Sequence, residues 1–129
     1  MRYLIDTSSV SRAMRDETYR LRRWLWNLGL DQIGISTMAL VEIEYGLARY
    51  RLRGASSIRE FAAHFESVAF DREDAHAAGR VRALLERRGH SIDLVDTLIA
   101  AQALVRDLTV ITHNAKDFQR VAGLRVIAL

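Results

Sequence analysis

Residues 3–9 read YLIDTSS, and this stretch indicates how the fold begins. A short apolar run is closed by Asp6, Thr7 and two serines, a change typical of a strand that ends and a helix that begins. Further short runs of strand type follow at residues 33–36, 67–70, 108–112 and 124–128. The chain therefore predicts several short strands, with an acidic residue directly after the first.

Apolar residues recur at helical spacing between these runs. Helices are predicted over residues 18–28, 37–51, around 58–65, from the Asp71 N-cap to Arg87, over 94–105 and over 114–120. Strands that alternate with helices predict an α/β fold in which a parallel sheet is covered on both faces. In such a fold the functional groups gather at the carboxyl ends of the strands.

The composition is that of one globular domain spanning residues 1–129. Half of the residues are hydrophobic and 27% are charged, and the absence of Cys excludes disulfides, thiolate zinc sites and a Cys nucleophile. We find no apolar stretch of signal-peptide length and no uncharged run long enough to cross a membrane. A soluble, cytoplasmic protein is expected.

The charged residues are unusually rich in arginine. The formal net charge is +3, and Lys116 is the only lysine among the 19 basic residues. A guanidinium group matches the geometry of a phosphate, so this composition is compatible with binding of nucleic acid. It is equally compatible with ordinary solubility.

Four acidic residues are expected near the same edge of the predicted sheet. Asp6 follows the first strand, Glu42 lies in the helix after the second, Asp96 begins the most apolar helix, and Asp117 follows residues 108–112. Clustered carboxylates repel one another unless cations bind between them. Mg²⁺ and Mn²⁺ accept such ligands and support hydrolysis of phosphodiesters.

Taken singly, each of these acids also has a structural interpretation. Asp6 suits a helix N-cap, and Asp96 and Asp117 each lie three residues after another capping residue. Helical periodicity does not distinguish Glu42 from Glu44. The pattern alone therefore does not decide whether these acids form a functional site.

Four motifs stand in order along the chain: YLIDTS at residues 3–8, ISTMALVEIEYG at 35–46, DTLIAAQA at 96–103 and VITHNAKDF at 110–118. They resemble the motifs of PIN-domain ribonucleases, particularly VapC toxins of VapBC toxin–antitoxin pairs. The resemblance covers nearly the whole chain in order. It implies a three-layer α/β/α PIN fold and an endoribonuclease with a Mg²⁺ or Mn²⁺ site. It also implies a cognate VapB-type antitoxin as partner, RNA as substrate and a toxin homodimer.

The same resemblance assigns the catalytic acids to Asp6, Glu42, Asp96 and Asp117. Asp6 and Asp96 would ligate the metal directly, while Glu42 and Asp117 would complete the acidic pocket. Thr7 and Thr112 would hold these carboxylates by hydrogen bonds. Asn114 stands where many relatives carry Asp, so either Asn114 or Asp117 serves the fourth position. The resemblance does not decide whether the site holds one metal ion or two.

Two further features are candidates for binding. Arg49, Arg51 and Arg53 lie in an acid-free stretch and would bind RNA phosphates. The alternative is that they form the solvated end of a helix, where their positive charges complement the helix dipole. Trp24 joins the apolar stripe of its helix, whereas Trp26 cannot join the same stripe and is predicted to contact a partner protein.

The competing interpretations are a phosphatase and a module without catalysis. A haloacid-dehalogenase-like phosphatase would need a second Asp where Ser8 stands. A non-catalytic PIN-like RNA-binding or scaffold module remains the alternative, and the presence of all four acids argues against it.

Overall fold

The computed structural model describes residues 1–16, 20–50 and 55–129. The strands are β1 (Tyr3–Ile5), β2 (Ile33–Ser36), β3 (Glu66–Val68), β4 (Thr109–Thr112) and β5 (Val126–Ala128). The helices are α1 (Thr7–Arg15), α2 (Arg20–Leu28), η1 (Leu30–Gln32, a 3₁₀ turn), α3 (Thr37–Tyr50), α4 (Ala55–Ala62), α5 (Arg72–Arg87), α6 (Leu94–Val105) and α7 (Ala115–Phe118).

All strand pairs of the central sheet are parallel, in the order β3-β2-β1-β4-β5. In this register Ile5 of β1 lies between Ile35 of β2 and Ile111 of β4. The chain moves outward from β1 to β3, then returns through α5 and α6 to β4 on the other side of β1. The strand order therefore reverses between β1 and β4, which is where parallel α/β sheets place their sites.

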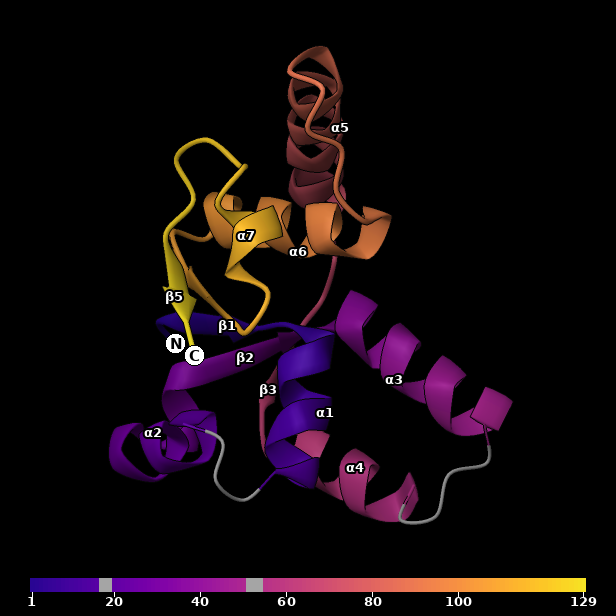
Figure 1. Cartoon of the computed structure of the whole chain (residues 1–129), viewed down its shortest axis with the longest axis vertical. Helices are drawn as coiled ribbons and strands as arrows, with labels where there is room; N and C mark the ends of the chain where they lie inside the picture. The colour runs from indigo at the N-terminus through magenta and orange to yellow at the C-terminus, as the bar shows by residue number, and fades with distance from the viewer. Residues whose placement is uncertain (17–19, 51–54) are drawn as a thin grey trace.

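Helices cover both faces of this sheet, as Figure 1 shows. Helices α1 to α4 lie on one face, and α6 and α7 lie on the other with α5 rising beyond them. Both faces of the central strands are consequently buried, and Leu4, Ile5, Val110 and Ile111 are all fully inaccessible to solvent. The predicted three-layer α/β/α fold with a central parallel sheet is confirmed.

Most predicted elements are present, with shifts of a few residues at their ends. Residues 94–105 form α6 as predicted, and Asp71 caps α5 in a capping box with Asp74. The apolar spacing around 58–65 predicts too long a helix, because α4 ends at Ala62. Phe65 nevertheless belongs to the core. The 3₁₀ turn η1 was not predicted.

Helix α6 explains why one acid of the predicted site is partly buried. Ile99, Ala100 and Ala103 are fully buried, and small side chains let this helix pack closely against α5 and the sheet. Asp96 stands in its first turn. Within the described residues, no helix is long and apolar enough to cross a membrane.

Candidate functional site

Asp6 is buried at the carboxyl end of β1, with 2% of its surface exposed. One carboxylate oxygen accepts a hydrogen bond from the Ser9 backbone N–H at 3.0 Å, which makes Asp6 the N-cap of α1. The other oxygen accepts from the Thr112 hydroxyl at 2.6 Å and from the Ser8 hydroxyl at 3.2 Å. The capping interpretation of Asp6 is therefore confirmed, and it is compatible with a place in the site.

Glu42 and Glu44, which periodicity does not distinguish, differ clearly in the structure. The Thr7 hydroxyl donates to Glu42 at 2.8 Å, so this carboxylate lies beside the start of α1, where Thr7 directly follows Asp6. Glu44 points to the exposed side of α3 and forms a bidentate pair with Arg59, at 2.7 and 2.9 Å. Thr7 and Thr112 were both expected to bind carboxylates of this group, and the structure shows which ones: Thr7 donates to Glu42 and Thr112 donates to Asp6.

The Asp96 carboxyl lies in surroundings that disfavour its ionised form. Burial first, and then the negative charges of Asp6, Asp93, Glu42 and Asp117, raise its pKa to about 7. A neighbouring carboxylate has this effect only from close by. The four predicted acids therefore form one group, which we call the acidic cluster and define as Asp6, Glu42, Asp96 and Asp117.

Asp117 lies in α7, just beyond the end of β4. The Asn114 side-chain amide donates to it at 3.0 Å, and the Asn114 backbone N–H donates to the Thr112 hydroxyl at 2.8 Å. Asn114 thus links Asp117 to the residue that holds Asp6. Asp117 contributes negative charge near Asp96, while the hydrogen bond from Asn114 orients the Asp117 side chain.

The donor chemistry of the acidic cluster fits a hard divalent cation. A partly buried carboxyl that is hard to ionise among three other carboxylates is the electrostatic situation that a cation relieves. In the described ranges, no three Asp, Glu or His side chains are arranged as they stand to hold a metal ion. Mg²⁺ does not require such a cage, since it is commonly held by one or two carboxylates with water and substrate oxygens.

Ser9 is a contributor that the sequence did not single out. Its hydroxyl is buried and accepts the backbone N–H of His113 at 3.1 Å, while its own N–H binds Asp6. This places the residue after β4 against the first turn of α1. A serine three residues after a helix cap carries no signal of such a long-range contact.

The predicted binding residues are only partly described. Arg49 is exposed at the end of α3, with its guanidinium 5.7 Å from the Tyr50 ring centre. Arg51 and Arg53 lie outside the described residues, and so does the side chain of Trp26. Trp24 packs against the core as predicted, edge-on to Tyr3 with ring centres 4.8 Å apart.

Comparison with known proteins identifies the family. Residues 3–124 match the PIN domain. The tRNA(fMet)-specific endonuclease VapC of Salmonella typhimurium is 27% identical over 98% of this chain and 96% of its own. Ribonuclease VapC18 of Mycobacterium tuberculosis is 33% identical over 96% of this chain and 90% of its own.

A solved structure with the same fold supports this relationship. A chain in DNA-bound VapBC from Salmonella typhimurium matches with a TM-score of 0.87 at 28% identity, covering 99% of this chain and 98% of that one. The resemblance seen in the four sequence motifs is thereby confirmed. This chain belongs to the PIN-domain family and is a homologue of the VapC ribonucleases.

Proposed function

We propose that this protein is the toxin of a type II toxin–antitoxin pair and cleaves RNA internally with the help of Mg²⁺ or Mn²⁺. PIN-domain ribonucleases in general depend on divalent metal ions. The observation that carries the proposal is the convergence of Asp6, Glu42 and Asp117 on the partly buried Asp96. A non-catalytic PIN-like module would have no need to keep four repelling carboxylates together.

Each acid has a distinct part in this proposal. Asp6 and Asp96 would hold the ion, which would supply Lewis-acid activation of a water and stabilise the charge on the phosphate. Glu42 and Asp117 would complete the acidic pocket and orient the attacking water. Thr7 and Thr112 keep Glu42 and Asp6 in place through their hydroxyl groups.

The proposed protein partner is a VapB-type antitoxin. Solved relatives include VapBC complexes from Salmonella typhimurium and Rickettsia felis. The assignment of Trp26 to such a contact remains a prediction, tested by whether Trp26→Ala weakens co-purification with the antitoxin while the chain stays folded. The proposed substrate also means that the protein acts in the cytoplasm.

A homodimer is proposed on the outer face of α3. Val41 and Tyr45 lie one helical turn apart on this face and are 61% and 63% exposed, so they present an apolar surface to solvent. A second copy would cover this surface. Light scattering of the purified toxin tests this, since Tyr45→Ser should shift the mass toward that of a monomer.

The RNA-binding role of Arg49, Arg51 and Arg53 remains a proposal. Arg49 follows Glu42 by two helical turns, so a phosphate near the acidic cluster lies within reach of an arginine on the same helix.

Mapping of RNA ends tests the proposed activity. Total RNA incubated with the protein should gain new internal ends at a few defined positions, and Asp6→Asn should remove them. Because Asp6 also caps α1, the variant must first be shown to be folded by circular dichroism. Intact RNA after incubation with folded wild-type protein would overturn the proposal.

A further inference from the structure

Helix α5 presents a continuous basic edge to solvent. This helix rises from the body of the molecule beside α6, as Figure 1 shows. Its inner face buries Asp74, Ala77, Ala78 and Leu85. The opposite side carries four exposed residues at intervals of four, four and seven positions: Arg72, His76, Arg80 and Arg87. We call these four residues the arginine edge.

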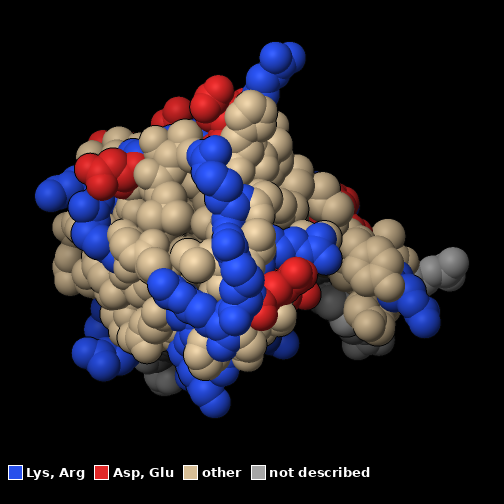
Figure 2. Space-filling view, turned by 90° about the horizontal axis from the view of Figure 1, so that it is seen from above, with Lys and Arg blue, Asp and Glu red and all other residues tan. Residues whose placement is uncertain are grey.

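The charges of the arginine edge are not neutralised by neighbours. Among the described residues, Arg72, Arg80 and Arg87 form no ion pair. Elsewhere on the same helix Arg82 pairs with Glu86 at 3.3 Å. Figure 2 looks onto the end of the molecule at which α5 stands and shows basic side chains in a band across it. Exposed guanidinium groups without a carboxylate partner remain available for an anion outside the chain.

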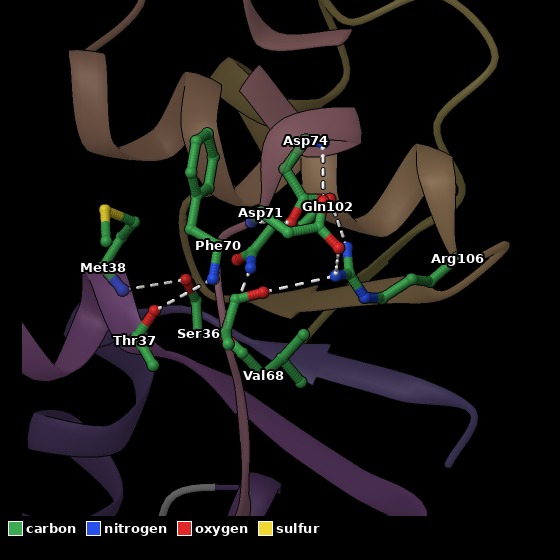
Figure 3. A network of polar contacts seen from close by, with 10 residues as sticks. Ser36, Thr37, Met38, Val68, Phe70, Asp71, Asp74, Gln102 and Arg106 are labelled. Atoms are coloured by element: carbon green, nitrogen blue, oxygen red, sulfur yellow. Dashed lines mark hydrogen bonds and ion pairs between the residues drawn. The ribbon is translucent and has the colours of Figure 1, made fainter. Parts of the chain in front are cut away.

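The base of α5 is anchored firmly to the site-bearing elements (Figure 3). Arg106 of the α6 C-terminus binds the buried Asp74, Asp71 and the Ala69 carbonyl. Gln102 of α6 donates to the Val68 carbonyl at 3.2 Å.

A second contact fixes the start of α5 against α3. The Phe70 backbone N–H donates to the Thr37 hydroxyl at 3.2 Å, also drawn in Figure 3, and Thr37 is the first residue of α3. The arginine edge is therefore held in a fixed position relative to α6, which carries Asp96, and α3, which carries Glu42.

We propose that the arginine edge binds phosphate groups of the RNA substrate at a distance from the bond that is cut. This inference rests on the proposed ribonuclease function and extends it to a second contact region. The chemistry favours RNA over a protein, since the other residues along this edge, the exposed Glu73 and the small Ala83, offer no apolar surface for a protein to bury. A row of fixed arginines suits the repeated charges of an RNA backbone.

The salt dependence of RNA binding tests the proposal. The probe is a single-stranded RNA of about 30 nucleotides, which is long enough to extend beyond the acidic cluster. Its binding is measured in EDTA, because EDTA prevents metal-dependent cleavage. The double variant Arg80→Ala/Arg87→Ala should bind less tightly. Its slope of log K against log salt should be smaller by about 1.4, or about 0.7 for each phosphate that an arginine no longer binds.

The matched control is Arg82→Ala/Arg125→Ala, which removes the same charge from two exposed arginines that already pair with Glu86 and Asp107. Its slope should stay within error of the wild type. An unchanged slope in Arg80→Ala/Arg87→Ala, or an equal reduction in the control, would overturn the proposal. So would loss of antitoxin or dimer association with RNA binding intact, which would identify a protein surface.

Cleavage kinetics separate this inference from the proposed function. With Mg²⁺ present, Arg80→Ala/Arg87→Ala should raise KM several-fold for the long RNA and leave its kcat unchanged. A short RNA that reaches only the acidic cluster should be cut as by wild type. If the wild type cuts neither RNA, the proposed function fails, while the binding experiment still decides whether the arginine edge holds RNA.

Discussion

The Thr112 hydroxyl donates a hydrogen bond of 2.6 Å to Asp6, across 106 residues of sequence. This bond joins the ends of β1 and β4, the two neighbouring strands between which the sheet order reverses. The same hydroxyl oxygen accepts the Asn114 N–H, and Asn114 binds Asp117. One buried threonine therefore fixes the relative positions of two acids of the cluster.

Removal of this hydroxyl should affect both activity and stability. Thr112→Val keeps the shape but removes the shortest hydrogen bond to Asp6 and leaves the Asn114 N–H without this acceptor. We therefore expect a loss of about 1–3 kcal/mol in the free energy of unfolding. Cleavage should slow by about 10–100-fold, as for other residues that orient metal ligands. Urea unfolding and single-turnover kinetics measure the two effects.

Two other variants serve as controls for Thr112. Thr112→Ser retains the hydroxyl and should lie nearer to the wild type. Thr109→Val, at the other end of β4, removes only an acceptor for exposed Arg125 and should cost less than about 0.5 kcal/mol. Equal effects of Thr112→Val and Thr109→Val would show that the bond to Asp6 is unimportant.

Glu42 and Glu44 provide a matched pair for the assignment of the site. Glu42→Gln should abolish measurable cleavage, because it removes a carboxylate from the acidic cluster. Glu44→Gln should cut RNA at the wild-type rate, because Glu44 pairs with Arg59 at the exposed surface. Glu44→Gln should stay folded because its pair with Arg59 is exposed to solvent. Circular dichroism should show that Glu42→Gln is folded as well. Retained activity in Glu42→Gln would remove this residue from the site.

Asp96→Asn should stabilise the metal-free protein at neutral pH. The folded-state pKa of about 7 lies above the ordinary value of 3.8, so the protonated carboxyl favours folding. This contribution is complete below the unfolded pKa and is lost as the pH rises through about 7. With allowance for the partial exposure of Asp96, the strain at pH 7.5 is on the order of 1–2 kcal/mol.

Thermal melts in EDTA at several pH values measure this effect. The variant should melt higher than the wild type at pH 7.5, and the difference should shrink as the pH falls toward 4. Added Mg²⁺ should then raise the melting temperature of the wild type more than that of Asp96→Asn. If the variant melts lower in EDTA and gains as much from Mg²⁺, Asp96 acts as a helix cap and not as a ligand.

The anchor of α5 should be a main source of stability. Burial favours the neutral form of Asp74, but hydrogen bonds from Arg106 and the Asp71 N–H, with the Arg106 charge, hold its pKa below the ordinary value. Arg106→Gln would leave this carboxylate buried and unpaired, at a cost of about 3–5 kcal/mol. Chemical unfolding should show this loss, whereas Arg125→Gln, which breaks a pair with the exposed Asp107, should be near neutral.

The pH dependence of that anchor has the opposite direction to that of Asp96. Because the pKa of Asp74 is lowered by folding, its contribution is present above the ordinary value of 3.8 and is lost as the pH falls below it. Arg106→Gln should therefore differ from wild type most at neutral pH and least in acid. A constant difference across this range would contradict the role given to the pair.

Local patterns in the sequence predicted the sheet and most helices because apolar periodicity and capping residues act over a few positions. Asp6 and Asp71 illustrate this, since each caps the helix that follows it. The choice between Glu42 and Glu44 was not available from periodicity, because the bond from Thr7 that separates them spans 35 residues. The pairing of Arg106 with Asp74 could not be predicted from local patterns for the same reason, because the partners are 32 positions apart in the sequence.

RNA cleavage by this protein should depend on a divalent ion held by the acidic cluster. The most direct test of this dependence is the single-turnover cleavage rate of one defined RNA, in excess EDTA and after Mg²⁺ or Mn²⁺ is restored. We predict that the wild type and Glu44→Gln do not cleave the RNA in EDTA and recover their full rate with either ion. Asp96→Asn should not cleave the RNA under either condition. Cleavage at the same rate in excess chelator would contradict the account.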